Sequence, residues 1–221
     1  VFGFMEFKGV GEIGLAYASV TIRILLFLSV FVLVRKEIKR EFNMLFIKRV
    51  FNFSLPVAFM FFLEVLAFCS VSVLSGFFSV VAAAANNIIM NLASIVFMVP
   101  LSISSAVAVR VGSAYGSNNH KRLKESALGA IILSFIFTIF RAATFVFFPV
   151  ALLKFFTNDY SVIKLGTSIM TIVALFQLFD GLQVTLSGIL RGMDQTKLTS
   201  IVVFMGYWVF GIPTGLYLAY A

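Results

Sequence analysis

Long apolar runs separated by short polar segments organise this chain. Six of the runs are long enough to cross a bilayer core of about 30 Å, which needs about 20 apolar residues in a helix. Strands of a β-barrel are excluded, because they would be about 10 residues long with alternating polarity. We therefore expect an all-α polytopic membrane protein with six transmembrane helices, at Gly14–Val34, Val50–Leu74, Val80–Ala108, Ala127–Leu153, Ser161–Leu190 and Leu198–Ala221.

The composition agrees with this pattern. Charged residues make up 12% of the 221 residues and hydrophobic residues 61%, whereas a soluble domain has about 25% charged residues. The net charge of +8 would suggest a nucleic-acid partner in a soluble protein, but here the charges lie between apolar runs, so we expect none. The sequence shows no nucleophile–base pair and no Cys/His cluster, so we expect neither an enzyme nor a cofactor. Cys69 is expected to be a packing residue, and His120 lies in a polar loop without a second ligand nearby.

Basic charge alternates from loop to loop. Three loops hold twelve Lys and Arg residues, and the opposite side holds three, at Lys8, Lys154 and Lys164. Lys and Arg accumulate in the cytoplasmic loops of membrane proteins. We therefore expect the basic loops to be cytoplasmic and both ends of this chain to be external.

Two of the nine acidic residues lie deep inside the predicted spans. Glu64 lies about 22 Å along the helix from Arg49, and Asp180 about 16 Å from Arg191, at a rise of about 1.5 Å per residue. An ionised carboxylate at the bilayer centre costs at least about 2.5–3.5 kcal/mol. We interpret the pair as a site that binds a proton, a metal cation such as Na⁺, or a cationic substrate.

A structural salt bridge is the alternative explanation for these carboxylates. Its candidates are Arg23 and Arg141, the basic residues within the spans, although Arg141 could instead extend towards the external surface. Polar residues recur at helical spacing beside the carboxylates and favour a functional site, although ordinary helix packing also gathers such residues. We expect a polar cavity supported by Asn87, Asn91, Ser94, Gln177 and Ser187.

Several motifs follow one another in the order found in a known family. The stretches "SLPVAFMFFLEVLAF", "NIIMNLASIVFMVPLSISSAVAVRVG" and "FQLFDGLQVTLSGILRGMDQTK" resemble the seventh, eighth and tenth helices of the MATE (multidrug and toxic compound extrusion) transporters, nearest their NorM-like branch. "YWVFGIPTG" resembles the eleventh helix, and residues 9–18 resemble the entry into the sixth. The structural residues of these motifs are Pro56, Pro100, Arg110, Gly112, Arg191 and Gly192.

The resemblance implies a fold of two six-helix lobes around a central cleft. Residues 1–49 would then form the end of the first lobe and a basic cytoplasmic inter-lobe loop. Residues 50–221 would form most of the second lobe, without its last helix. We therefore expect a fragment of a plasma (inner) membrane protein, whose partners are the lipid bilayer and the missing first-lobe helices of the same chain.

The resemblance also implies a function. The family exports mostly cationic or amphipathic organic compounds against inflowing Na⁺ or H⁺ by alternating access, with Glu64 and Asp180 at the coupling positions. Phe176 stands where NorM-like members often have Tyr, so both Na⁺ and H⁺ remain candidates for the coupling ion. The alternatives are a lipid-linked oligosaccharide flippase of the same superfamily, which predicts a cavity rich in basic residues, and a channel or non-transporting membrane subunit.

Overall fold

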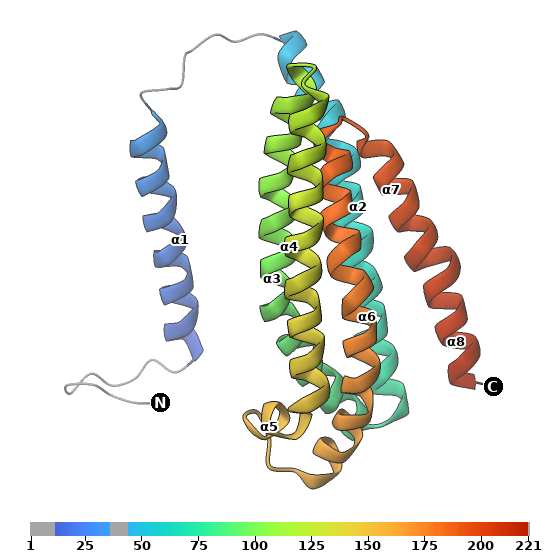
Figure 1. The fold of residues 1–221 in the computed structure, drawn as a ribbon. Helices are drawn as coiled ribbons and strands as arrows, with labels where there is room; N and C mark the ends of the chain where they lie inside the picture. Colours follow the sequence, from blue (N-terminus) through green and yellow to red (C-terminus); the bar gives the residue numbers. More distant parts are fainter. Residues whose placement is uncertain (1–11, 36–43, 221) are drawn as a thin grey trace. The chain divides into compact units, whose positions relative to one another are not determined.

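The computed structural model describes residues 12–35 and 44–220, and all regular elements within these ranges are helices (Figure 1). Six helical segments in these ranges are long and apolar enough to cross a membrane, which confirms the predicted fold class. The elements are α1 (Glu12–Val34), α2 (Met44–Phe78), α3 (Val80–Gly116), α4 (His120–Phe147), α5 (Pro149–Lys154), α6 (Tyr160–Gly192), α7 (Thr196–Phe204), η1 (Met205–Gly211) and α8 (Ile212–Tyr220).

The chain divides into two units, residues 1–47 and 48–221. In the first unit, almost every described side chain of α1 is exposed, including Arg23. Residues 36–43, which hold much of the predicted basic inter-lobe loop, lie outside the described residues. The assignment of residues 1–49 to a first lobe therefore stays a prediction.

Two spans are longer than the apolar runs that predict them. The span expected to begin at Val50 starts at Met44, and the span expected to end at Ala108 continues to Gly116. In α3 helical hydrogen bonding continues into polar sequence, and in α2 it already begins in the mostly apolar "MLFIKR" before Val50, because each added residue extends a helix that is already formed. Arg110 and Gly112 therefore belong to α3, and the connection expected between Ala108 and Ala127 shrinks to residues 117–119.

The prediction of one continuous span over Ala127–Leu153 is wrong. α4 ends at Phe147 and α5 begins at Pro149. Proline has no N–H to continue the preceding helix, and its fixed φ suits the first turn of a new one. The chain reverses direction around α5 (Figure 1), and Leu153 packs so closely on α6 that a Cβ at Gly166 would lie 2.9 Å from its side chain.

Helices α3 and α6 pack together through small residues on both sides. A Cβ at Gly188 would collide with the backbone and hydroxyl of Ser104, and a Cβ at Gly192 would lie 2.7 Å from the Ala108 carbonyl oxygen. A Cβ at Gly112, one turn further along α3, would lie 3.4 Å from the Gly192 carbonyl oxygen. Small residues four apart let membrane helices approach closely. Motif glycines 80 residues apart in the sequence thus share one contact.

A layer of hydroxyl groups joins α3 and α4 to α6. Ser104 donates to the Val184 carbonyl at 2.6 Å, and Ser134 donates to the Gly181 carbonyl at 3.1 Å. Thr185 donates to Ser134 Oγ at 2.9 Å. This layer separates two apolar clusters. The first packs on α6 before the layer and consists of Ile89, Ala142, Phe145, Leu153, Met170 and Ala174. The second packs on α6 after the layer and consists of Val107, Val111 and Ile189.

The sixth span runs through α7, η1 and α8 and contains a π-helical turn. Pro213 lies just after that turn. Because proline cannot donate a backbone hydrogen bond, the preceding turn is free to widen, and i→i+5 bonding is one way to do so. The Gly206 carbonyl oxygen lies 3.0 Å from the position of a Cβ at Gly211, five residues on. A larger residue at 211 would crowd the wide turn.

Side chains of the sixth span attach it to α2. Ser200 Oγ donates to the Pro56 carbonyl at 2.6 Å, and Trp208 Nε1 donates to the Leu63 carbonyl at 3.2 Å. These bonds to the α2 backbone fix the height of the π-helical turn relative to Glu64, which follows Leu63 directly.

Large apolar side chains cover the outside of these helices. They are exposed along all six long helical segments of the described residues, as at Phe140, Phe179 and Phe210, which are 69%, 74% and 62% exposed. An apolar surface of this extent is unfavourable in water and matches the hydrocarbon core of a bilayer. The fold is therefore that of an integral membrane protein.

Candidate functional site

Glu64 on α2 and Asp180 on α6 lie in one buried site. Each is only 6% exposed. The hydroxyl group of Tyr207, from η1, lies close enough to the carboxyl groups of both residues to interact with each of them. The sequence indicated a similar depth for the two carboxylates, and the structure places one hydroxyl group beside both.

Tyr207 reaches this position from the π-helical turn. Its ring packs at an angle on the ring of Phe68 of α2, with centroids 5.9 Å apart. Phe176 also packs on the ring of Phe68, with centroids 6.3 Å apart. The resemblance of "YWVFGIPTG" to a helix of the family does not by itself identify Tyr207 as a site residue. A tyrosine six residues before a proline inside a span was an available signal. Tyr207 supplies a phenolic hydroxyl near the carboxylates, which Phe176 cannot do.

Arg141 on α4 faces the Asp180 side of the site. It is 2% exposed, and its Nη2 donates to the Gln177 carbonyl at 2.6 Å. It is close enough to Asp180 for their charges to interact. The expectation that Arg141 could extend towards the surface is therefore wrong. Gly181 makes room for the guanidinium group, since a Cβ there would lie 3.3 Å from Nη2.

Arg191, at the end of α6, faces the Glu64 side. Its Nη2 donates to Ser104 Oγ at 2.8 Å, and its guanidinium group lies 5.5 Å from the centre of the Phe61 ring. Its charge interacts with that of Glu64. The sequence placed Arg191 in a basic loop, whereas the structure turns its side chain inwards along α3. Each buried carboxylate thus has one guanidinium group near it.

Several buried polar atoms around the carboxylates have no hydrogen-bond partner. Within the described residues they are Glu64 Oε1, Asp180 Oδ1, Arg141 Nε, Arg191 Nε and both side-chain polar atoms of Gln177. Buried polar groups are normally paired with protein or with ordered water. These groups are therefore candidates to bind water molecules or an ion.

The donor set fits a small hard cation. The carboxylate oxygens of Glu64 and Asp180 and the Tyr207 hydroxyl are oxygen ligands, which such cations prefer. The described residues contain no group of three or more His, Cys, Asp or Glu side chains that could hold a metal ion. A bound Na⁺ would therefore need the tyrosine hydroxyl or water to complete its shell.

The other predicted cavity residues fall into two groups. Gln177 and Ser187 are buried on α6, at 2% and 7% exposure. Asn87, Asn91 and Ser94 are exposed on α3. The Asn91 side-chain amide donates to the Asn87 carbonyl at 3.0 Å, and Ser94 donates to the Asn91 carbonyl at 2.8 Å. The structure therefore gives α3 a separate polar stripe, away from the buried side of that helix.

The remaining sequence expectations concern single residues. Pro100 is buried within α3, and Pro56 lies inside α2, where its carbonyl accepts from Ser200. Cys69 is exposed, so the expectation of a packing residue is wrong in the described part of the chain. His120 is the exposed first residue of α4.

A cavity of about 480 Å³ opens beside Tyr207. Phe68, Phe176 and Tyr207 form part of its wall, and α2, α3, α6, η1 and α8 all contribute residues to it. Its lining is mostly apolar, with Asn86 and Ser75 among its few polar residues. An apolar, aromatic chamber thus adjoins the buried carboxylates, and Tyr207 borders both.

Comparison with known proteins gives consistent matches. The family model described as MatE matches residues 56–217. A "Probable multidrug resistance protein NorM" of Mesorhizobium japonicum is 36% identical over 171 residues, which are 75% of this chain and 37% of the relative. A "Multidrug resistance protein MdtK" of Proteus mirabilis is 31% identical over 230 residues, covering 97% and 48%. A "Probable multidrug resistance protein NorM" of Bacillus cereus is 29% identical over 231 residues, covering 99% and 51%. The chain spans about half the length of these relatives or less.

Proposed function

Because this chain belongs to the MatE family, we propose that it is part of a multidrug transporter that exports cationic or amphipathic organic compounds in exchange for Na⁺ or H⁺. The names of its relatives, multidrug resistance proteins, support transport rather than enzymatic chemistry. Helices of a first lobe would complete the central cleft and are the partners that this chain requires. No cofactor is needed beyond the coupling ion.

The observation that carries this proposal is the pair of buried carboxyl groups that share Tyr207. Two ionised carboxylates repel each other strongly where little water separates them. The guanidinium groups of Arg141 and Arg191 offset part of that repulsion, and a proton on one carboxyl group, or a Na⁺ between the two, would remove more of it. The free energy of binding the proton or the Na⁺ would then be available to drive a change of conformation.

The hydroxyl of Tyr207 makes the two carboxyl groups act as one unit. A phenol has a single proton to donate, so it cannot donate to both carboxylates at once. If one carboxyl group is protonated, it donates to the Tyr207 oxygen while Tyr207 donates to the other carboxylate. If Na⁺ binds instead, the phenolic oxygen becomes a ligand. Either cation would satisfy contacts that a single phenolic proton cannot complete.

The adjoining cavity of about 480 Å³ is the proposed place for part of the substrate. Its aromatic wall suits a flat organic cation, because aromatic faces attract positive charge. Since Tyr207 borders both the cavity and the carboxylates, the substrate and the coupling ion would each act on the same side chain. Exchange then follows if the two ligands favour different states of an alternating-access cycle.

The proposed setting is the plasma (inner) membrane, with the α3–α4 and α6–α7 loops cytoplasmic. The excess of basic residues at these loops supports that orientation. The chain would then begin and end on the external side of the membrane in this part of the protein.

The alternatives receive less support. A lipid-linked oligosaccharide flippase would favour an excess of cations in its cavity, whereas the buried site balances Glu64 and Asp180 against Arg141 and Arg191. A channel would conduct without saturation, whereas an antiporter saturates with substrate and responds to an imposed ion gradient.

Efflux of ethidium from cells that express the full-length protein tests the proposal. We expect Asp180→Asn and Glu64→Gln each to lower the gradient-driven efflux rate at least about tenfold, because each removes an ionisable group from the coupling site. Imposing a Na⁺ gradient or an H⁺ gradient separately on vesicles identifies the coupling ion.

Asp194→Asn is the matched control, because Asp194 is an exposed carboxylate in the loop after α6 with φ of 62°, which asparagine tolerates. It should leave efflux unchanged. Wild-type efflux in both site variants, at equal amounts of protein in the membrane, would contradict the coupling role.

A further inference from the structure

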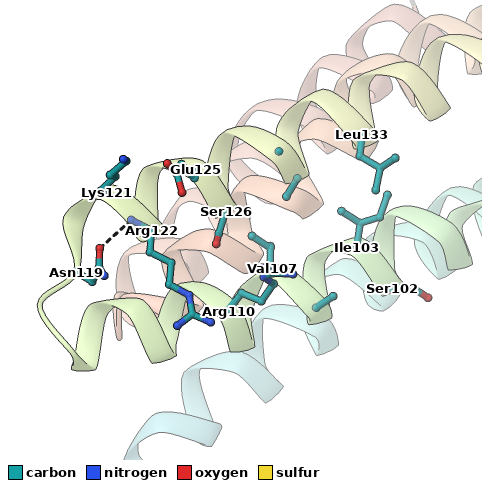
Figure 2. Close-up of a pocket in the computed structure, with 13 residues that line it drawn as sticks. Ser102, Ile103, Val107, Arg110, Asn119, Lys121, Arg122, Glu125, Ser126 and Leu133 are labelled. Atoms are coloured by element: carbon teal, nitrogen blue, oxygen red, sulfur yellow. Dashed lines mark hydrogen bonds between the residues drawn. The ribbon is translucent and has the colours of Figure 1, made fainter.

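A second cavity lies between α3 and α4, at the end of these helices that carries their connecting loop (Figure 2). Its volume is about 980 Å³, and its residues differ from those of the buried site. The lining residues of α3 lie between Ser102 and Arg110, and those of α4 and its preceding loop lie between Asn119 and Leu133. We call this cavity the α3–α4 groove. The proposed transport function does not use it.

Uncompensated positive charge marks the loop end of the groove. Arg110, Lys121 and Arg122 line it, and Glu125 is its one acidic residue. Within the described residues, none of these three basic side chains makes a hydrogen bond or an ion pair. The Arg122 backbone N–H is already used, since it donates to Asn119 Oδ1 at 3.0 Å. The unpaired groups are therefore the side chains, and they attract an anion.

The two arginines are placed to hold one anion together. Arg110 extends from α3 and Arg122 from α4, both into the gap between the helices, whereas Lys121 points away from that gap (Figure 2). Guanidinium groups present several fixed N–H donors that match phosphate oxygens and bind them in bidentate fashion. An anion with several oxygens, shared by both helices, would relieve the repulsion between the two arginines.

The rest of the groove is apolar and runs along the span. Its wall includes Ile103, Val107 and Leu133. Ser102 lies about 12 Å along the helix axis from Arg110, at a rise of about 1.5 Å per residue. The groove stays open at Gly129, where an added Cβ would meet nothing within 4 Å. A free inorganic anion would make no favourable contact with this apolar wall, whereas the acyl chains of a lipid would pack on it.

We propose that the α3–α4 groove binds an anionic phospholipid, with its phosphate group on Arg110 and Arg122 and its acyl chains along Ile103, Val107 and Leu133. The groove has the two parts that such a ligand needs, a cationic mouth at the helix ends and an apolar trough within the span. Basic pockets between membrane helices are known to take lipid head groups. The lipid would come from the leaflet that meets the α3–α4 loop.

Native mass spectrometry of the purified full-length protein, exposed to equal amounts of phosphatidylglycerol and phosphatidylcholine, tests this assignment. We expect the protein to retain phosphatidylglycerol in preference. Arg110→Gln with Arg122→Gln should lower that retention about tenfold or more, because both phosphate contacts are lost. Arg110→Lys with Arg122→Lys should keep most of it, because lysine still binds phosphate as a point charge.

Two further variants separate the sources of the phosphate and the effect of charge alone. Gly129→Leu fills the apolar trough without changing charge, and it should also lower phosphatidylglycerol retention. Lys154→Gln with Lys164→Gln removes two exposed basic residues elsewhere and should leave retention unchanged. Equal retention of both lipids by the wild-type protein would overturn the proposal. Full retention in Gly129→Leu, together with displacement by excess inorganic phosphate, would assign the groove to a free anion and would overturn it too.

Discussion

The hydroxyl group of Tyr207 is the smallest feature on which the buried site depends. It lies close to both carboxyl groups, and its ring packs on Phe68, which helps to fix the position of the oxygen. In the proposed exchange of cations, an oxygen fixed beside both groups would let the state of one group influence the other. The same ring borders the cavity of about 480 Å³. In the proposed mechanism, the Tyr207 hydroxyl would therefore connect the ion site with the cavity.

Replacing Tyr207 by Phe tests this role. The substitution keeps the ring on Phe68 and removes only the hydroxyl, so we expect normal folding but efflux reduced about tenfold, the value of one hydrogen bond to a charged group. We also expect the dependence of efflux on external pH or Na⁺ to change its midpoint. The measurement is ethidium efflux over a range of pH and Na⁺ concentrations.

Tyr115→Phe is the control, because Tyr115 is exposed at the end of α3. It should match the wild-type protein in rate and in midpoint. A Tyr207→Phe protein with an unchanged midpoint, whatever its rate, would reduce the hydroxyl to a structural group.

At this scale the sequence predicted the acidic residues but not their surroundings. Glu64 and Asp180 could be found because carboxylates inside apolar runs are costly and therefore rare. The inward direction of Arg141 and Arg191 could not, because a long side chain near a helix end can turn towards water or protein, and neighbouring helices decide which. The signal for Tyr207 was weak, because a tyrosine in a membrane helix is common and its direction depends on the π-helical turn, which only Pro213 indicates.

Among the helices, the contact between α3 and α6 holds the site together. Gly188 and Gly192 on α6 lie against Ser104, Ala108 and Gly112 on α3. Ser104 also accepts from Arg191 and donates to the α6 backbone. The close approach therefore places the Arg191 guanidinium near Glu64. A larger distance between α3 and α6 would move the Arg191 guanidinium group relative to Glu64 although both side chains were still present.

Gly188→Ala should destabilise this contact. Its new Cβ would collide with the Ser104 backbone, and overpacking of this kind costs about 1–3 kcal/mol. We expect the thermal unfolding midpoint of the purified protein to fall by several degrees, and efflux to fall with it. Gly76→Ala in α2 is the matched control, since an added Cβ there meets nothing within 4 Å. A Gly188→Ala protein as stable as Gly76→Ala would show that the helices can separate without cost.

At the scale of the whole second unit, residues 48–221, apolar helices carry more basic residues at one end than at the other. The α3–α4 loop adjoins Arg110, Lys121, Arg122 and Lys124, whereas the turn around α5 carries Lys154 and Lys164. This asymmetry is the physical basis of the proposed orientation, because basic segments cross membranes poorly.

Single cysteines test the orientation. In a background without other cysteines, Ser117→Cys should react with a membrane-impermeant maleimide only after the membrane is opened. Asn158→Cys, in the loop before α6, should react in intact cells. Both positions are exposed. The reverse pattern would invert the proposed topology.

The architecture was the most predictable part of the chain. Bilayer thickness fixes the length of an apolar run, so six spans could be counted from the sequence. Their ends could not be placed, because α3 continues into polar sequence and α2 begins before the two basic residues that precede Val50. The break at Pro149 was also hidden, since a proline in an apolar run can kink a span or end it.

The π-helical turn determines the direction in which the side chains of α8 point. Residues 207, 211 and 215 line one cavity and are four apart. An α-helix advances about 100° per residue, so in a regular α-helix each residue of this row would lie about 40° further round the helix than the one before it. Hydrogen bonds from residue i to residue i+5 widen the turn and make the rotation per residue smaller, which keeps the row on one side. With one residue fewer in the turn, the cavity wall of α8 would rotate away from Tyr207 although every side chain was still present.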